Sequence, residues 1–107
     1  MNNRARGARG EREARDAMNQ HFGFDSKRAA QANGSLSADL IGTGNLSVEV
    51  KKRKALSVQK FIDQAVKDAP LDKTPIVLMR EDRGEWLVMV RIEDARAFAR
   101  EILAAKP

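Results

Sequence analysis

The chain has 107 residues, of which 33% are charged and 42% apolar, the balance of one small globular domain with a single core. It has no cysteine, which excludes a disulfide framework, a zinc ribbon and a thiol nucleophile, so any bound metal must use oxygen ligands. The net charge is +5, and the excess lies in residues 1–60, which hold 12 Lys and Arg against 6 Asp and Glu. Such a basic half favours nucleic acid as the partner, because binding phosphates releases counterions.

The chain shows no sequence signal for a membrane or for export. Its longest apolar run, residues 76–79, is far too short to span a bilayer, and its start lacks the apolar core of a signal peptide. Arginines near the start could suggest a transit peptide, but Glu11, Glu13 and Asp16 argue against one. We therefore expect a cytoplasmic protein with no membrane partner.

The N-terminal segment divides into an arm and a helix. Residues 1–10 carry two glycines and three arginines without an apolar period, which predicts a flexible basic arm. From Glu11 to about Gln20 an apolar stripe predicts a helix, with Glu11 facing inward and Glu13 outward. Gly23 is expected to end this helix as its C-cap.

Three strands are expected next. A first strand is placed around residues 25–31, and the segments LSADLIG and NLSVEVK, joined by GTGN, predict a hairpin. Matching the apolar faces of the hairpin requires paired residue numbers to sum to 86 or 88. In the second case Asp39 stands directly across from Glu49, and in the first it is diagonal to it, so both registers bring the two carboxylates together.

Residues 55–69 have a strong helical period, with Val58, Phe61, Ile62, Ala65, Val66 and Ala69 on the apolar face. Two further strands, IVLMR and EWLVMVR, flank a turn at EDRG. A closing helix is expected to face the core with Ile92, Ala95, Phe98, Ala99, Ile102 and Leu103. The predicted fold class is α/β (α+β), a single domain over residues 1–107 with a central mixed sheet flanked by helices, in the order α-β-β-β-α-β-β-α.

Two carboxylates held a few ångströms apart raise each other's pKa unless a cation lies between them. Mg²⁺ suits such a site, because it takes oxygen ligands and leaves positions for phosphate oxygens, and Mn²⁺ is a plausible substitute. We expect Asp39 and Glu49 to bind the metal, with Glu11 completing the shell directly or through water. Lys51, on the same strand face as Glu49, could hold the attacking water or neutralise developing charge.

Each of these features also has a structural interpretation. Glu-Val-Lys is common on the wet face of a half-buried strand, and the run KKRK that follows Val50 is usually a solvated charge cluster. Glu11 could simply be an acid favoured by the helix dipole. His21 is interpreted as structural, and Trp86 as a core residue or dimer contact.

Asp39, nine intervening residues, and then Glu49-x-Lys51 resemble the metal motif of the PD-(D/E)XK nuclease superfamily. The segments RGEREARD, LSVEVKKRKAL, FIDQAVKDA and PIVLMREDRGEWLVMV are similar to small phage and prophage endonucleases described as Holliday junction resolvase-like. The resemblance covers residues 7 to about 95 and implies a restriction-endonuclease-like core. One departure is Ala38, which stands where the superfamily motif has proline.

The resemblance implies catalytic roles for Glu11, Asp39, Glu49, Lys51 and Gln64. Gln64 corresponds to a helix glutamine near the site, and its alternative is an ordinary solvated residue. The cations expected to contact DNA are Arg4, Arg6, Arg9, Arg12, Lys27, Arg28, Lys52, Arg53, Lys54, Lys60, Arg80 and Arg83.

The sequence thus predicts a Mg²⁺-dependent, structure-selective DNA endonuclease, a Holliday junction resolvase acting as a homodimer in a bacterial or phage-infected cell. A two-fold dimer is required because two like strands must be cut at one junction. Two alternatives remain open: another nicking, repair or processing nuclease, and a basic nucleic-acid-binding module without catalysis. An architectural partner protein is supported only by size and charge.

Overall fold

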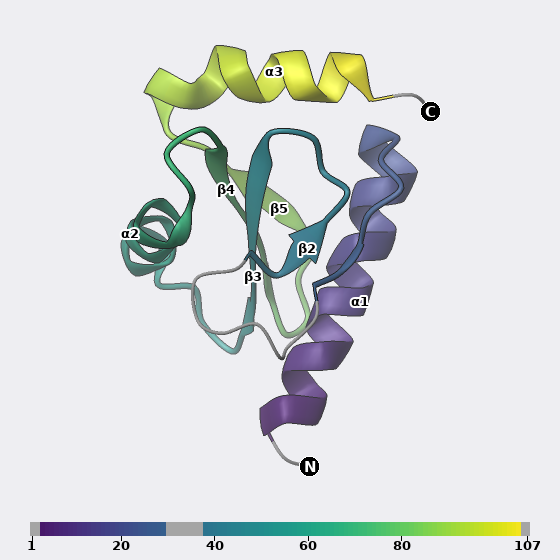
Figure 1. Ribbon diagram of the computed structural model, residues 1–107. Helices are drawn as coiled ribbons and strands as arrows, with labels where there is room; N and C mark the ends of the chain where they lie inside the picture. Colours follow the sequence, from purple (N-terminus) through teal and green to yellow (C-terminus); the bar gives the residue numbers. More distant parts are fainter. Residues whose placement is uncertain (1–2, 30–37, 106–107) are drawn as a thin grey trace.

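Two long parallel strands form the centre of a five-stranded sheet in the order β1-β2-β3-β4-β5 (Figure 1). The computed structural model describes residues 3–29 and 38–105, with side chains from residue 7 onward. The elements are α1 (Asn3–Phe22), β1 (Lys27–Arg28), β2 (Leu40–Ile41), β3 (Leu46–Arg53), α2 (Val58–Asp68), β4 (Thr74–Glu81), β5 (Leu87–Met89), the 3₁₀ turn η2 (Ile92–Asp94) and α3 (Ala95–Ala104). The predicted order of elements and the single α+β domain are confirmed.

Strands β3 and β4 are paired in parallel along eight positions, from Leu46↔Thr74 to Arg53↔Glu81. Strands β1, β2 and β5 are added antiparallel, which makes the sheet mixed. Helix α2 makes the crossover between the two parallel strands, as such a connection requires. Because β3 and β4 are covered on both faces, most of their side chains are buried.

The alternation of side chains along these strands divides the core into two layers. On one face, Val48 and Ile76 pack under α1 through Ala14 and Met18. On the other face, Val77 and Met79 pack under α2 through residues that include Phe61, Ile62 and Ala65. Figure 1 shows α1 and α2 on opposite sides of the sheet and α3 across one end.

The predicted hairpin between β2 and β3 is present. Gly42 and Gly44 both have positive φ, 76° and 58°, the left-handed conformation that favours glycine. A Cβ at Gly42 would also lie 2.8 Å from the Asp25 carbonyl oxygen, so glycine is required here on two grounds. The predicted C-cap is present as well, since Gly23 has φ 81° and donates its N–H to the Asn19 carbonyl at 3.2 Å.

The predicted boundary at the start of the chain is wrong. Residues 3–10 are not an arm outside the fold but the first turns of α1, which runs unbroken from Asn3. Alanine and arginine are strong helix formers, and they outweigh the cost of two glycines. Gly10 is buried, with Lys52 as its nearest neighbour, so packing against β3 also holds this segment.

The predicted inward face of the closing helix is also wrong in part. Phe98 packs edge-on against Phe22, with 5.9 Å between ring centroids, and Ile102 is half-buried. Ile92 and Leu103, however, are 95% and 85% exposed, and Ala95 and Ala99 are exposed beside them. Because α3 crosses the end of the sheet and not its face, only one narrow side of the helix meets the core. Among the described residues no helix is both long and apolar enough to cross a bilayer.

Replacing Ile76 by alanine should lower the free energy of unfolding by about 2–5 kcal/mol. This β4 side chain is fully buried under α1, beside Val48 of β3. The matched control is Leu71→Ala, which removes a fully exposed apolar side chain and should change stability by less than about 0.5 kcal/mol. Urea unfolding of both variants measures the difference. Equal effects would mean that the α1-side core is wrongly placed.

Candidate active site

The site begins at Asp39, directly before the first residue of β2. Leu40 is paired with Val48, so the paired residue numbers sum to 88, one of the two predicted registers. Asp39 therefore stands across from Glu49, on the same face of the sheet. Asp39 lies directly before β2 and Glu49 lies on β3, and the hairpin brings their carboxylates together.

Asp39 is held by hydrogen bonds of both its backbone and its side chain. Its N–H donates to the Val48 carbonyl at 2.9 Å, and its own carbonyl accepts from Ala29 N–H at 3.0 Å. Its carboxylate oxygen Oδ2 accepts from the Val50 N–H at 2.7 Å. The Asp39 side chain thus accepts the hydrogen bond of a β3 N–H group that lies beyond the end of the pairing with β2. These three hydrogen bonds hold Asp39 in place.

Burial of the two carboxyl groups gives the site its electrostatic character. Glu49 is only 8% exposed, and desolvation, together with repulsion from Asp39, raises its pKa to about 7. Desolvation also raises the pKa of Asp39, although the hydrogen bond from Val50 opposes this. A buried acid pair of this kind is stabilised by a cation between its oxygens.

Lys51 lies beside Glu49 and is oriented from helix α2. Its Nζ donates to Gln64 Oε1 at 2.8 Å and lies 3.7 Å from Glu49 Oε1. The ammonium also lies 5.8 Å from the centre of the Phe61 ring, a distance suited to a cation–π interaction. Gln64 was expected near the site, and its hydrogen bond with Lys51 places it beside the site.

Glu11 reaches the same region from α1 but has its own partner. Arg28 Nε donates to Glu11 Oε1 at 3.0 Å, and burial raises the pKa of Glu11 in spite of this pair. Repulsion from Asp39 adds to the rise, and both residues line one cleft. Within residues 3–29 and 38–105, no three acidic or histidine side chains are grouped so that they could hold a metal ion. The oxygens of Asp39 and Glu49 are of the type that a hard divalent ion takes as ligands.

Four of the five predicted catalytic residues, Glu11, Asp39, Glu49 and Lys51, line one open cleft of about 730 Å³, and Gln64 does not. The cleft lies between the first half of α1 and the second half of β3. Its walls are Gly7, Arg9, Gly10, Glu11, Asp39, Glu49, Val50, Lys51, Lys52, Arg53 and Asp82. Arg9, Lys52 and Arg53 therefore provide positive charge beside the acid pair.

The remaining cations expected to contact DNA are distributed unevenly. Arg12, Lys27, Lys54, Lys60 and Arg83 are exposed on the surface outside this cleft. Arg28 forms an ion pair with Glu11, and Lys52 and Arg80 both form ion pairs with Glu13. The side chains of Arg4 and Arg6 lie outside the described part of the structure.

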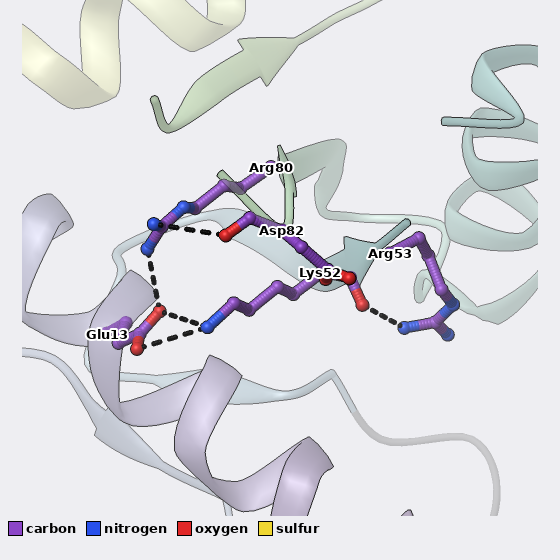
Figure 2. Close-up of polar contacts among 5 residues, drawn as sticks. All are labelled: Glu13, Lys52, Arg53, Arg80 and Asp82. Carbon is purple, nitrogen blue, oxygen red and sulfur yellow. Dashed lines mark hydrogen bonds and ion pairs between the residues drawn. The ribbon is translucent and has the colours of Figure 1, made fainter. Parts of the chain in front are cut away.

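The prediction that Glu13 faces outward is wrong. Figure 2 shows its carboxylate between Lys52 of β3 and Arg80 of β4, at 3.1 Å and 3.0 Å. These partners lie 39 and 67 residues away along the chain, so the local helical period could not reveal them. The sequence analysis also missed Asp82 of the β4–β5 turn, which lines the cleft. The cleft wall on α1 includes Gly7 and Gly10, and their spacing of three residues, which puts both on one helix face, was the available signal for it.

Two residues that were set aside as structural lie outside this site. His21 is exposed in the last turn of α1, and it does not line the cleft. Trp86 is partly buried and packs against the α1-side core, as its core interpretation requires.

In metal-free buffer, Glu49→Gln should stabilise the protein at pH 8 but not at pH 4. The pKa of Glu49 is about 7 in the folded state against 4.5 ordinarily, so folding favours its protonated form and stability falls as pH rises through this range. The neutral isostere removes that loss, which should be worth on the order of 1–2 kcal/mol at pH 8. Urea unfolding with EDTA at both pH values measures the gap. Glu93→Gln, an exposed acid on η2, is the control, and a gap for Glu49→Gln that does not depend on pH would contradict the assignment.

Comparison with known proteins agrees with this geometry. The sequence matches the family described as "Phage putative PDDEXK endonuclease" over residues 2–105, while no curated protein matches the chain. Among solved structures it is similar to Hjc of Archaeoglobus fulgidus, a Holliday junction resolvase from an archaeal hyperthermophile. The TM-score is 0.56 and the identity 28%, covering 78% of this chain and 75% of that chain. With a match across nearly its whole length, this chain belongs to the phage PDDEXK endonuclease family.

Proposed function

We propose that this protein is a divalent-metal-dependent DNA endonuclease that hydrolyses phosphodiester bonds in branched DNA, above all four-way junctions. One observation carries the proposal: Asp39, directly before β2, and Glu49, on β3, meet beside Lys51 in a cleft with basic walls. Membership of the endonuclease family and the likeness to Hjc support it. We place its action in the cytoplasm of a bacterial or phage-infected cell, where such DNA is found.

The donor set of the cleft fits a hard divalent ion. Asp39 and Glu49 offer carboxylate oxygens, and their buried charges favour a cation between them. When bound, Mg²⁺, or Mn²⁺ in its place, would polarise the phosphoryl group and lower the pKa of the attacking water. Glu11 is close enough to Asp39 to raise its own pKa, and we propose that it contributes to the outer shell.

Lys51 carries the second chemical role. Its ammonium is positioned between Glu49 and Gln64, so it can stabilise negative charge that develops on the phosphoryl oxygens or orient the attacking water. Gln64 contacts the amine and not the acids, and we propose that it positions Lys51. The strand fixes the backbone of Lys51, while α2 fixes the direction of its side chain.

The proposed assembly is a homodimer with two equivalent sites. Two symmetric cuts at a junction require two active sites related by a two-fold axis. Exposed apolar side chains on η2 and α3, Ile92 and Leu103 together with Ala95 and Ala99, support α3 as the contact.

Single substitutions Asp39→Ala, Glu49→Ala and Lys51→Ala should each lower cleavage of a four-way junction by at least about 100-fold, because each removes a group from the reacting centre. Junction binding should remain within about fivefold of the unaltered protein, since the outer cations are retained. Gel assays of cleavage with Mg²⁺ or EDTA, and anisotropy for binding, separate the two. Asp63→Ala, an exposed acid on α2, is the control. Binding by the unaltered protein without metal-dependent cleavage would instead favour a non-catalytic binding module.

Substrate choice is tested with the same protein on four-way, flap, nicked and linear DNA. Faster cleavage of the four-way junction is expected, because backbone shape and not base sequence is what such a cleft can recognise. Equal cleavage of linear duplex would remove junction selectivity and leave the endonuclease assignment standing.

Leu103→Asp should convert the dimer to a monomer, since it places a charge in the apolar contact proposed for α3. Light scattering measures the mass, and Val58→Asp is the control because Val58 is an exposed apolar residue on α2. If light scattering shows that the unaltered protein is strictly monomeric, the two-site proposal is contradicted.

A further inference from the structure

Glu13, Lys52 and Arg80 form the Glu13 cluster, which joins α1, β3 and β4 (Figure 2). Lys52 and Arg80 are directly paired across the parallel β3–β4 ladder. They follow Val50 and Leu78 along the strand face that packs under α1, so the α1-side core ends in two adjacent cations. Like charges in such a cross-strand pair repel each other.

Glu13 compensates this repulsion with a single carboxylate. Lys52 Nζ donates to Oε1 and Oε2 at 3.1 Å and 3.3 Å, and Arg80 Nη1 donates to Oε1 at 3.0 Å. The three side chains are only 33%, 23% and 25% exposed. Ion pairs that are largely removed from water hold their geometry better than surface pairs, so Glu13 fixes where both cations lie.

The cluster keeps a net charge of +1, and its donors are not saturated. Arg80 Nη2 makes only a long bond of 3.4 Å to the Asp82 carbonyl, and its buried Nε has no acceptor among the described residues. Lys52 and Asp82 both line the cleft that contains Asp39 and Glu49. Of the two cations, Lys52 lines this cleft and Arg80 is its neighbour across the β3–β4 ladder, so the charge of Lys52 faces the space that a DNA strand would occupy.

We propose that Lys52 and Arg80, aligned by Glu13, form one subsite for a phosphate of the DNA backbone adjoining the phosphate that is cut. This inference rests on the proposed endonuclease function and deepens it. Glu13 is a positioning residue, acting through Lys52 and Arg80 and not by touching DNA. A Cβ on Gly10 would lie 3.5 Å from the Cβ of Lys52. Glycine at this position therefore lets α1 run close to this subsite.

The test is DNA binding in EDTA, where no cleavage occurs, measured by anisotropy at several salt concentrations. Glu13→Gln keeps the shape but removes the charge, so the two cations separate and one phosphate contact is lost. We expect Kd to rise about fivefold and the salt dependence of log K to fall by about one unit. Loss of an acid would, on charge alone, tighten binding, so weaker binding separates positioning from simple electrostatics.

Two controls make the result specific. Asp16→Asn removes the same charge from the same helix at an exposed position that pairs with the neighbouring Arg15, and it should leave the salt dependence unchanged. In a Lys52→Gln background, Glu13→Gln should have little further effect, because the two act through one contact. Glu13→Asp, which retains the charge, should recover part of the affinity.

The outcomes are distinguishable. Tighter binding by Glu13→Gln would overturn the inference and make Glu13 a competitor of phosphate, and unchanged binding would overturn it as well. In either case Mg²⁺-dependent cleavage by the unaltered protein would leave the proposed function standing. Absence of DNA binding by the unaltered protein would overturn the proposed function itself.

Discussion

The hydrogen bond from the Val50 N–H to the carboxylate of Asp39 connects the fold to the site. Strand β2 has only two residues, and β3 has eight, so β3 runs on beyond the end of their pairing. A buried strand edge needs an acceptor for its N–H groups, and Asp39 provides one with its side chain. The same bond directs the carboxylate toward Glu49. Sheet geometry and the position of the acid pair are therefore one constraint, set by the register Leu40↔Val48.

Carboxylates are used in two opposite ways around this edge. Glu11 and Glu13, both on α1, form close ion pairs with Arg28 and with Lys52 and Arg80. Asp39 and Glu49 are buried together, and for both the pKa is raised above its ordinary value. The helix acids each have a cation at 3.0–3.1 Å, whereas Asp39 and Glu49 repel each other beside Lys51, whose Nζ lies 3.7 Å from Glu49 Oε1. This contrast marks Asp39 and Glu49, and not the helix acids, as the pair suited to a divalent ion.

Local sequence patterns predicted the sheet and its central pair of acids for a clear reason. The alternation in β3 and the glycines of the hairpin are properties of neighbouring residues, and together they restrict the register to two choices. The direction of Glu13 could not be predicted in this way, because its partners come from β3 and β4, far along the chain. The face of α3 was wrong for a similar reason. An amphipathic period shows that a helix has an apolar side, but not whether that side covers the sheet or only its end.

The exact positions of the site residues depend on two supports of unequal strength. Glu49, Lys51, Lys52 and Arg80 lie on β3 and β4, whose eight-position parallel pairing is buried on both faces and includes fully buried Val48, Ile76 and Val77. Asp39 instead depends on a two-residue strand and its own three hydrogen bonds. Local opening of a short edge costs less free energy than opening a packed centre. Burial of two mutually repelling carboxylates adds strain at this weaker edge, so a ligand that neutralises them would order Asp39 first. The part of the site with the shortest strand support is thus also the part that a bound cation would stabilise most.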